Sequence, residues 1–266
     1  GVDLFLACAV IAVITAIYIT IGGQTAIIFT DLAQAFMLIT AGVTLLILGL
    51  LFLGQGDGLF AGIHNFWTNT PFKSRLPFAG FNKPSDFNFV GVFWQDMANS
   101  CVYFFVNQGL IMRYLAAKSA EESRKTILIN SCCLLPFAVV VVGGAGWVGH
   151  AIANMTPDRL DPNTPGNQAF VAVAYLLCKP GVFGFMMAAL VAALMSTVDT
   201  NVNALAAISV VDIYQPYVAP GRSDRHYLKV ARIVSVVAAG AGLALVVLFD
   251  QFKSIYVAHA AFTAAI

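Results

Sequence analysis

Long apolar stretches, each long enough to cross a lipid bilayer, make up most of this chain. A membrane-spanning helix needs about 20 largely apolar residues. Hydrophobic residues form 59% of the sequence and charged residues only 10%, whereas soluble domains carry about 25% charged residues. The chain is therefore predicted to be an all-α polytopic membrane protein embedded in the lipid bilayer. The predicted spans lie near residues 2–21, 25–53, 89–112, 126–153, 181–211 and 228–250, with a partial seventh at 254–266.

The two ends of the sequence indicate a piece of a larger membrane domain. The chain begins at Gly1 without an initiator methionine or a signal-peptide pattern, and its last apolar stretch is too short to cross a bilayer. We therefore interpret residues 1–266 as a fragment of a single transmembrane domain, with helices missing at both ends.

Positive charges are concentrated in two of the predicted loops. Residues 113–125 and residues 212–232 each hold four Lys or Arg side chains. If every span crosses the membrane once, the two loops lie on the same side, and an excess of Lys and Arg marks the cytoplasmic side. We therefore predict a multi-pass protein of the plasma (inner) membrane in which both loops are cytoplasmic.

Polar side chains interrupt the span near 181–211. At about 3.6 residues per turn, Ser196, Asp199, Thr200 and Asn203 share one helical face. An ionisable group at the centre of a bilayer costs about 2.5–3.5 kcal/mol on insertion scales, so it needs a partner or a function. Hydroxyl, carboxylate and amide oxygens are the ligands of hard cations. The stripe predicts either a cation site or a polar seam that holds helices together.

Asp31 is a second acid inside a predicted span. It follows the Gly22-Gly23 turn by less than three helical turns, and Gln34 shares its face at i+3. One interpretation is an acid favoured by the dipole at a helix N-terminus. The other is part of an ion path that starts from the cytoplasm.

Other patterns in the sequence argue against chemistry on a substrate. Gly144, Gly146 and Gly149 match a dinucleotide-binding motif, but they lie inside an apolar span, so we interpret them as close helix packing. The sequence has no HExxH motif, no Cys/His metal spacing and no clear nucleophile–base arrangement. A net charge of +1 gives no reason to expect nucleic acid as a partner. The chain is not predicted to be an enzyme.

Three motifs together resemble the sodium:solute symporters, which include sodium–sugar and sodium–proline cotransporters. Their order and spacing are similar to those of the family's core helices four to nine and the start of helix ten. The motifs are Gly22-Gly23-x-x-Ala26-x-x-x-Thr30-Asp31-x-x-Gln34, then Asn107-Gln108 with Arg113 and Leu115-Ala116-Ala117-Lys118-Ser119, then Ala193-x-x-Ser196-Thr197 with Asn203 and Val211-Asp212-Ile213-Tyr214.

The resemblance implies a LeuT-like fold of two inverted repeats, of which this chain covers a part. It also implies sodium sites on the eighth core helix. The common sodium site would use the Ala193 carbonyl and the hydroxyls of Ser196 and Thr197. A further sodium would be held by Asp31 with Ser196, Asp199 and Thr200. Hydroxyl residues are usual at position 199, so Asp199 is a departure that strengthens this site or makes it sensitive to protons.

Substrate contacts implied by the resemblance fall near residues 100–107. Sugar-transporting members carry an Asn at the position of Ser100 and a Tyr-Trp pair at Tyr103-Phe104, so only Tyr103 matches. Tyr103 is either a residue that stacks on the solute or ordinary helix packing. Asn107 is the fourth candidate. The solute class therefore stays open among sugars or polyols, carboxylates and amino acids.

These features predict a sodium-coupled secondary symporter that imports a small polar organic solute by alternating access, with Na⁺ as the coupling ion. One alternative is a proton-coupled symporter that uses Asp31 and Asp199. Another is the solute-sensing membrane module of a signalling protein. The sequence leaves the solute, the ion stoichiometry and the oligomeric state open.

Overall fold

The computed structural model describes residues 4–70, 101–102, 107–165 and 168–249. Every regular element within these ranges is a helix, as the apolar composition predicted. The elements are α1 (Leu4–Leu53), α2 (Leu59–Asn69), α5 (Gln108–Leu115), α6 (Ala120–Ile129), the π-helix η2 (Asn130–Leu134), α7 (Leu135–Met155), α8 (Ala169–Leu177), α9 (Pro180–Ala207), the π-helix η4 (Ile208–Val218) and α10 (Asp224–Phe249).

Four of the described helical stretches are long and apolar enough to cross a membrane. They are Phe5–Leu53, Ala120–Met155, Pro180–Val218 and Asp224–Val246. The first covers the two spans predicted at 2–21 and 25–53, and the others match those predicted at 126–153, 181–211 and 228–250. The partial span at 254–266 and most of the span at 89–112 lie outside the described residues.

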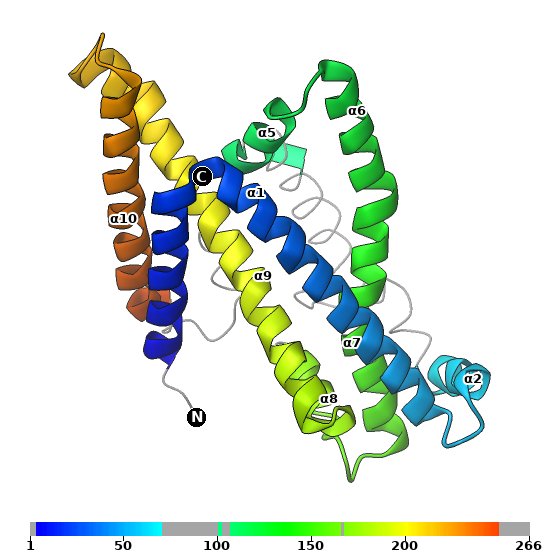
Figure 1. Cartoon of the computed structure of the whole chain (residues 1–266). Helices are drawn as coiled ribbons and strands as arrows, with labels where there is room; N and C mark the ends of the chain where they lie inside the picture. Colours follow the sequence, from blue (N-terminus) through cyan, green and yellow to red (C-terminus); the bar gives the residue numbers. More distant parts are fainter. Residues whose placement is uncertain (1–3, 71–100, 103–106, 166–167, 250–266) are drawn as a thin grey trace. The chain divides into compact units, whose positions relative to one another are not determined.

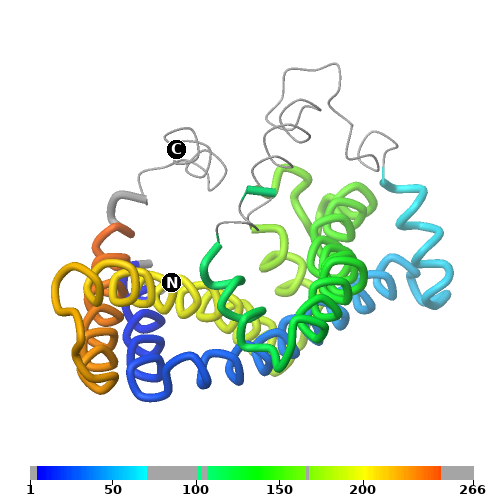
Figure 2. The backbone as a smooth tube through the Cα atoms, turned by 90° about the horizontal axis from the view of Figure 1, so that it is seen from above, coloured from blue at the N-terminus to red at the C-terminus, as the bar shows by residue number. Residues whose placement is uncertain are grey.

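The described residues divide into two compact units. One contains the chain up to Gln34 and from Val191 onward, and the other runs from Ala35 to Leu190. In the first unit, the N-terminal part of α1, the C-terminal part of α9 and α10 lie side by side (Figures 1 and 2). This unit contains the predicted sodium ligands.

Gly23 breaks α1 where the sequence predicted a turn. Its backbone has φ 59° and ψ −152°, so the helices on either side of it are joined across a kink. Glycine adopts a positive φ without the steric cost that a β-carbon brings. The chain reverses direction at this break (Figure 1), which allows residues before and after Gly23 to contact the same face of α9.

Small residues on α1 allow close helix packing in the second unit. A β-carbon on Gly42 would collide with Val141, and one on Gly49 would collide with Val148. The two glycines and the two valines are each seven residues apart, so one side of α1 packs closely against α7. Such close contacts between small residues favour helix association in a bilayer, where there is no hydrophobic driving force between helices.

Candidate cation site

Ser196 and Asp31 meet in the first unit. The Ser196 hydroxyl donates a hydrogen bond to Asp31 Oδ1 at 2.5 Å. Hydroxyl–carboxylate bonds are short because the acceptor is charged. At Ser196, the polar stripe on α9 therefore faces the part of α1 that follows the Gly23 break.

Asp199 lies one turn after Ser196 and is completely buried, with 0% of its surface exposed. The Tyr18 hydroxyl donates to Asp199 Oδ2 at 2.5 Å. The Thr200 hydroxyl donates to Asp199 Oδ1 at 3.3 Å and to the Ser196 carbonyl at 2.8 Å. Hydroxyl donors on both oxygens offset part of the cost of burying the carboxylate.

Tyr18 is the residue of this site that the sequence did not reveal. It belongs to the predicted span at 2–21 and precedes Gly22 by about one turn. The signal in the sequence is weak, because an aromatic ring is common in any apolar span. Only its hydroxyl group distinguishes Tyr18 from a phenylalanine, and a buried tyrosine hydroxyl usually has a hydrogen-bond partner.

The predicted common sodium site lies on the same segment of α9. The Thr197 hydroxyl donates to the Ala193 carbonyl at 3.2 Å, so two of the three predicted oxygen ligands lie within hydrogen-bonding distance. Thr197 is exposed, whereas Ser196 is half-buried. Ser196 is common to both predicted sodium sites. Along α9 it follows Ala193 of the first site and precedes Asp199 and Thr200 of the second.

The oxygen atoms of this cluster are suitable ligands for a hard cation. Carboxylate, hydroxyl and carbonyl oxygens suit small hard ions, whereas transition metals prefer imidazole and thiolate ligands. Across the described part of the chain, no three His, Cys, Asp or Glu side chains lie close enough together to hold a metal ion. Two buried or half-buried acids on neighbouring segments need a positive charge or a proton to compensate them.

A second polar contact lies two helical turns from the first. The Asn203 amide donates to the Gln24 side-chain oxygen, again joining α9 to the part of α1 after the Gly23 break. Gln24 is the first residue after that break. Asn203 was predicted as part of the polar stripe, whereas its partner Gln24 was not.

The structure does not test the predicted substrate residues. Ser100, Tyr103 and Phe104 lie outside the described residues. Asn107 is the N-cap of α5 in the second unit, and its side chain accepts a hydrogen bond from the Leu110 backbone N–H at 2.9 Å. All four residues therefore stay predictions.

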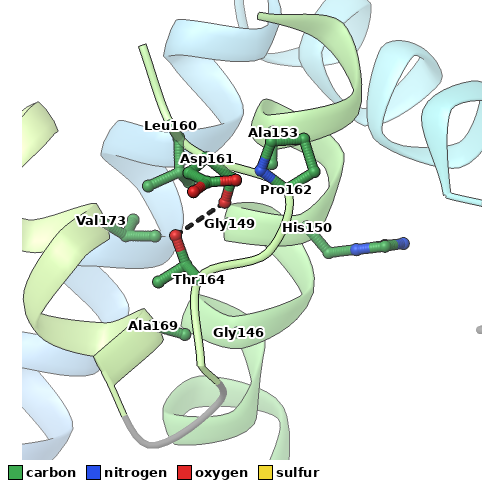
Figure 3. A pocket seen from close by; sticks show the side chains of 10 residues that line it. All are labelled: Gly146, Gly149, His150, Ala153, Leu160, Asp161, Pro162, Thr164, Ala169 and Val173. Carbon is green, nitrogen blue, oxygen red and sulfur yellow. Dashed lines mark hydrogen bonds between the residues drawn. The ribbon is translucent and has the colours of Figure 1, made fainter. Parts of the chain in front are cut away.

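A cavity of about 220 Å³ lies between α7, α8 and the segment that joins them (Figure 3). Gly149 packs tightly there, since a β-carbon would approach Val173 within 2.6 Å, but one on Gly146 would meet nothing within 4 Å in the described part of the chain. The Thr164 hydroxyl donates to the Asp161 carbonyl at 2.7 Å (Figure 3). His150, Asp161 and Thr164 are the polar residues among those that line the cavity, and we assign no site to it.

Membrane-capable helices that bury acids and hydroxyls beside a broken helix are the architecture of secondary transporters. Comparison with known proteins agrees. The chain matches the sodium:solute symporter family over residues 1–266 and belongs to it. It is therefore a membrane-integral protein of a family of transporters, and not an enzyme.

Three relatives illustrate the range of the family. The chain is 30% identical over 252 residues to a sodium/glucose cotransporter of Vibrio parahaemolyticus, covering 90% of this chain and 46% of that protein. It is 26% identical over 236 residues to sodium-coupled monocarboxylate transporter 1 of Xenopus laevis, covering 82% and 35%. It is 27% identical over 256 residues to human sodium/myo-inositol cotransporter 2, covering 87% and 37%. The chain thus spans less than half the length of these relatives.

A solved structure confirms the fold. The chain resembles a Na⁺-coupled sialic acid symporter in its substrate-bound outward-open state, with a TM-score of 0.81 and 20% identity, covering 95% of this chain and 52% of the symporter. At this identity the likeness concerns the fold alone, and it confirms the partial LeuT-like architecture that the sequence motifs implied.

Proposed function

We propose that the full-length protein imports a small polar organic solute together with Na⁺ across the plasma membrane. The observation that carries this proposal is the linked set of oxygens around Asp31, Ser196 and Asp199, in a chain of the sodium:solute symporter family. In this reading, sodium binding stabilises the state open to the outside, and the solute then binds before both are released inward. The loops at 113–125 and 212–232 are cytoplasmic in this proposal.

The proposed sodium ligands form two adjoining sets. The Ala193 carbonyl and the Thr197 hydroxyl belong to the first set, and Asp31, Asp199 and Thr200 belong to the second. Ser196 serves both, because its hydroxyl binds Asp31 while its backbone lies one turn after Ala193. This arrangement supports more than one coupled cation per solute.

Uptake into proteoliposomes tests the proposed function. The full-length protein is reconstituted and given glucose, myo-inositol, lactate, proline or sialic acid, each with an inward Na⁺ gradient or with K⁺ in its place. We expect at least one solute to accumulate only with Na⁺. Accumulation driven by a proton gradient without Na⁺ would instead support the proton-coupled alternative, which the burial of Asp199 favours. Binding without any transport would support the solute-sensing alternative.

Removing a hydroxyl from the first set is expected to weaken sodium binding. Ser196→Ala and Thr197→Ala each delete an oxygen with little change in volume. Because a contact to a charged partner is worth about 1.5–3 kcal/mol, the Na⁺ half-saturation of uptake should rise at least about tenfold. Ser235→Ala is the control, since the Ser235 hydroxyl is buried in the same unit but binds its own helix at the Ala231 carbonyl. Unchanged sodium dependence in both variants would contradict the ligand assignment.

Tyr103 is proposed to contact the solute, with Ser100 one turn earlier on the same face. Aromatic rings bind apolar ligand surfaces, and the hydroxyl can complete a polar network. Tyr103→Ala is expected to weaken solute affinity about tenfold while Na⁺ binding persists. Tyr217→Ala is a matched control, because Tyr217 is 82% exposed. Should the solute affinity of Tyr103→Ala equal that of the wild type, Tyr103 would be a packing residue only.

A further inference from the structure

Two polar contacts between the same helices form a regular ladder. Asp31 contacts Ser196 and Gln24 contacts Asn203. Gln24 lies seven residues before Asp31, and Asn203 lies seven residues after Ser196. The segment of α1 after the Gly23 break and this part of α9 are therefore antiparallel, and the two contacts are roughly 10 Å apart along the helix axis.

The contact between Gln24 and Asn203, here called the amide pair, lies toward one end of the ladder. Gln24 directly follows the Gly23 break, and Asn203 is close to η4, which leads into the basic segment 212–232. Under the proposed orientation this end is cytoplasmic. A cation that leaves the acids along the ladder toward the cytoplasm meets the amide pair.

Buried apolar side chains lie near the amide pair along both helices, since Ile27 follows Gln24 by one turn and Val202 precedes Asn203. Ile27 and Val202 are 1% and 6% exposed and belong to one buried cluster with Ile19 and Ala239. A bare cation cannot cross such packing, because burying an unpaired charge in an apolar environment is very costly. A cation path that follows the polar side chains of these two segments would therefore run past the two amides.

We propose that the amide pair is a gate which closes the cytoplasmic end of the cation path; this inference rests on the proposed function. Each amide carries one oxygen acceptor and one NH₂ donor, and in the closed arrangement an NH₂ of Asn203 satisfies the oxygen of Gln24. When that hydrogen bond breaks, both amide oxygens can turn toward a passing cation. Neutral amides offer these oxygens without a fixed charge that would trap the ion.

The experiment measures binding of radiolabelled Na⁺ to the purified full-length protein, without any solute. Half-saturation is measured at equilibrium, and dissociation is followed after dilution into unlabelled Na⁺. The variants are Gln24→Ala and Asn203→Ala. The matched control is Asn201→Ala, because Asn201 is an exposed amide on the same helix.

A gate and a ligand differ in what they change. Gln24→Ala and Asn203→Ala are each expected to speed dissociation about three- to tenfold, the range expected for one lost hydrogen bond, and to leave half-saturation unchanged. Unchanged half-saturation also shows that the variant is folded, and Asn201→Ala should match the wild type. Dissociation at the wild-type rate in both variants would reduce the pair to a structural seam. A higher Na⁺ concentration at half-saturation would show that the amide pair is part of the binding site. Either result would contradict the proposal that the amide pair is a gate. If the wild type itself binds no Na⁺, the proposed function fails and the gate with it.

Discussion

Replacing Asp31 with asparagine is expected to remove the second cation from the transport cycle. The change keeps the size of the side chain and its ability to accept the hydrogen bond from Ser196, but it deletes the negative charge. A unit charge about 4 Å from a cation contributes on the order of 4 kcal/mol at an effective dielectric constant of about 20. Even a third of that attraction corresponds to about a tenfold loss of affinity, so we expect the second site to be empty at ordinary Na⁺ concentrations.

The reversal potential of the full-length protein in proteoliposomes measures this loss, because it reports the charge carried per solute. Asp31→Asn should lower that charge by about one relative to the wild type. Asp57→Asn is the control, since Asp57 is an exposed acid in the turn between α1 and α2. If Asp31→Asn carries the same charge per solute as the wild type, Asp31 is a structural hydrogen-bond acceptor and the proposed second site is wrong.

The helical spans could be predicted from the sequence because a bilayer imposes a simple rule, whereas the LeuT-like arrangement came only from the family resemblance. Apolar stretches must form helices that satisfy their own backbone, and Gly22-Gly23 marked the place where the chain turns. The polar stripe on α9 followed in the same way from helical periodicity. These features depend on neighbouring residues, so no knowledge of tertiary contacts was needed to predict them.

The residues that contact the polar stripe on α9 could not be predicted in this way, because they come from segments distant in the sequence. Asp31 and Ser196 are 165 residues apart in the sequence, and only the family resemblance suggested that they meet. Tyr18 and Gln24 carried no such signal. Tyr18 is an aromatic residue among apolar neighbours, and the position of Gln24 depends on the relative register of α1 and α9. That register is set by packing around Ile27 and Val202, which periodicity alone cannot give.

Asp199 and Tyr18 should be energetically coupled, so that the effect of substituting one depends on whether the other is present. Tyr18→Phe removes the hydroxyl and leaves a fully buried carboxylate with one donor fewer. Leaving a buried charged group short of a partner costs about 1–3 kcal/mol or more, so this variant should lose thermal stability and sodium affinity. Asp199→Ser removes the charge and introduces the hydroxyl residue usual in the family, so we expect it to retain sodium coupling.

The double variant Tyr18→Phe/Asp199→Ser separates the two effects. Once the acid is absent, the Tyr18 hydroxyl has no buried charge to satisfy, and its loss should cost much less than it does in the wild type. Thermal unfolding and Na⁺ half-saturation of the four proteins form a double-mutant cycle, whose interaction energy we expect to exceed about 1 kcal/mol. The reversal potential of Asp199→Ser should also vary less with pH than that of the wild type, because the site then contains Asp31 but no second acid. Strict additivity in the cycle, with the same pH dependence in Asp199→Ser and the wild type, would show that the Tyr18–Asp199 contact takes no part in cation coupling.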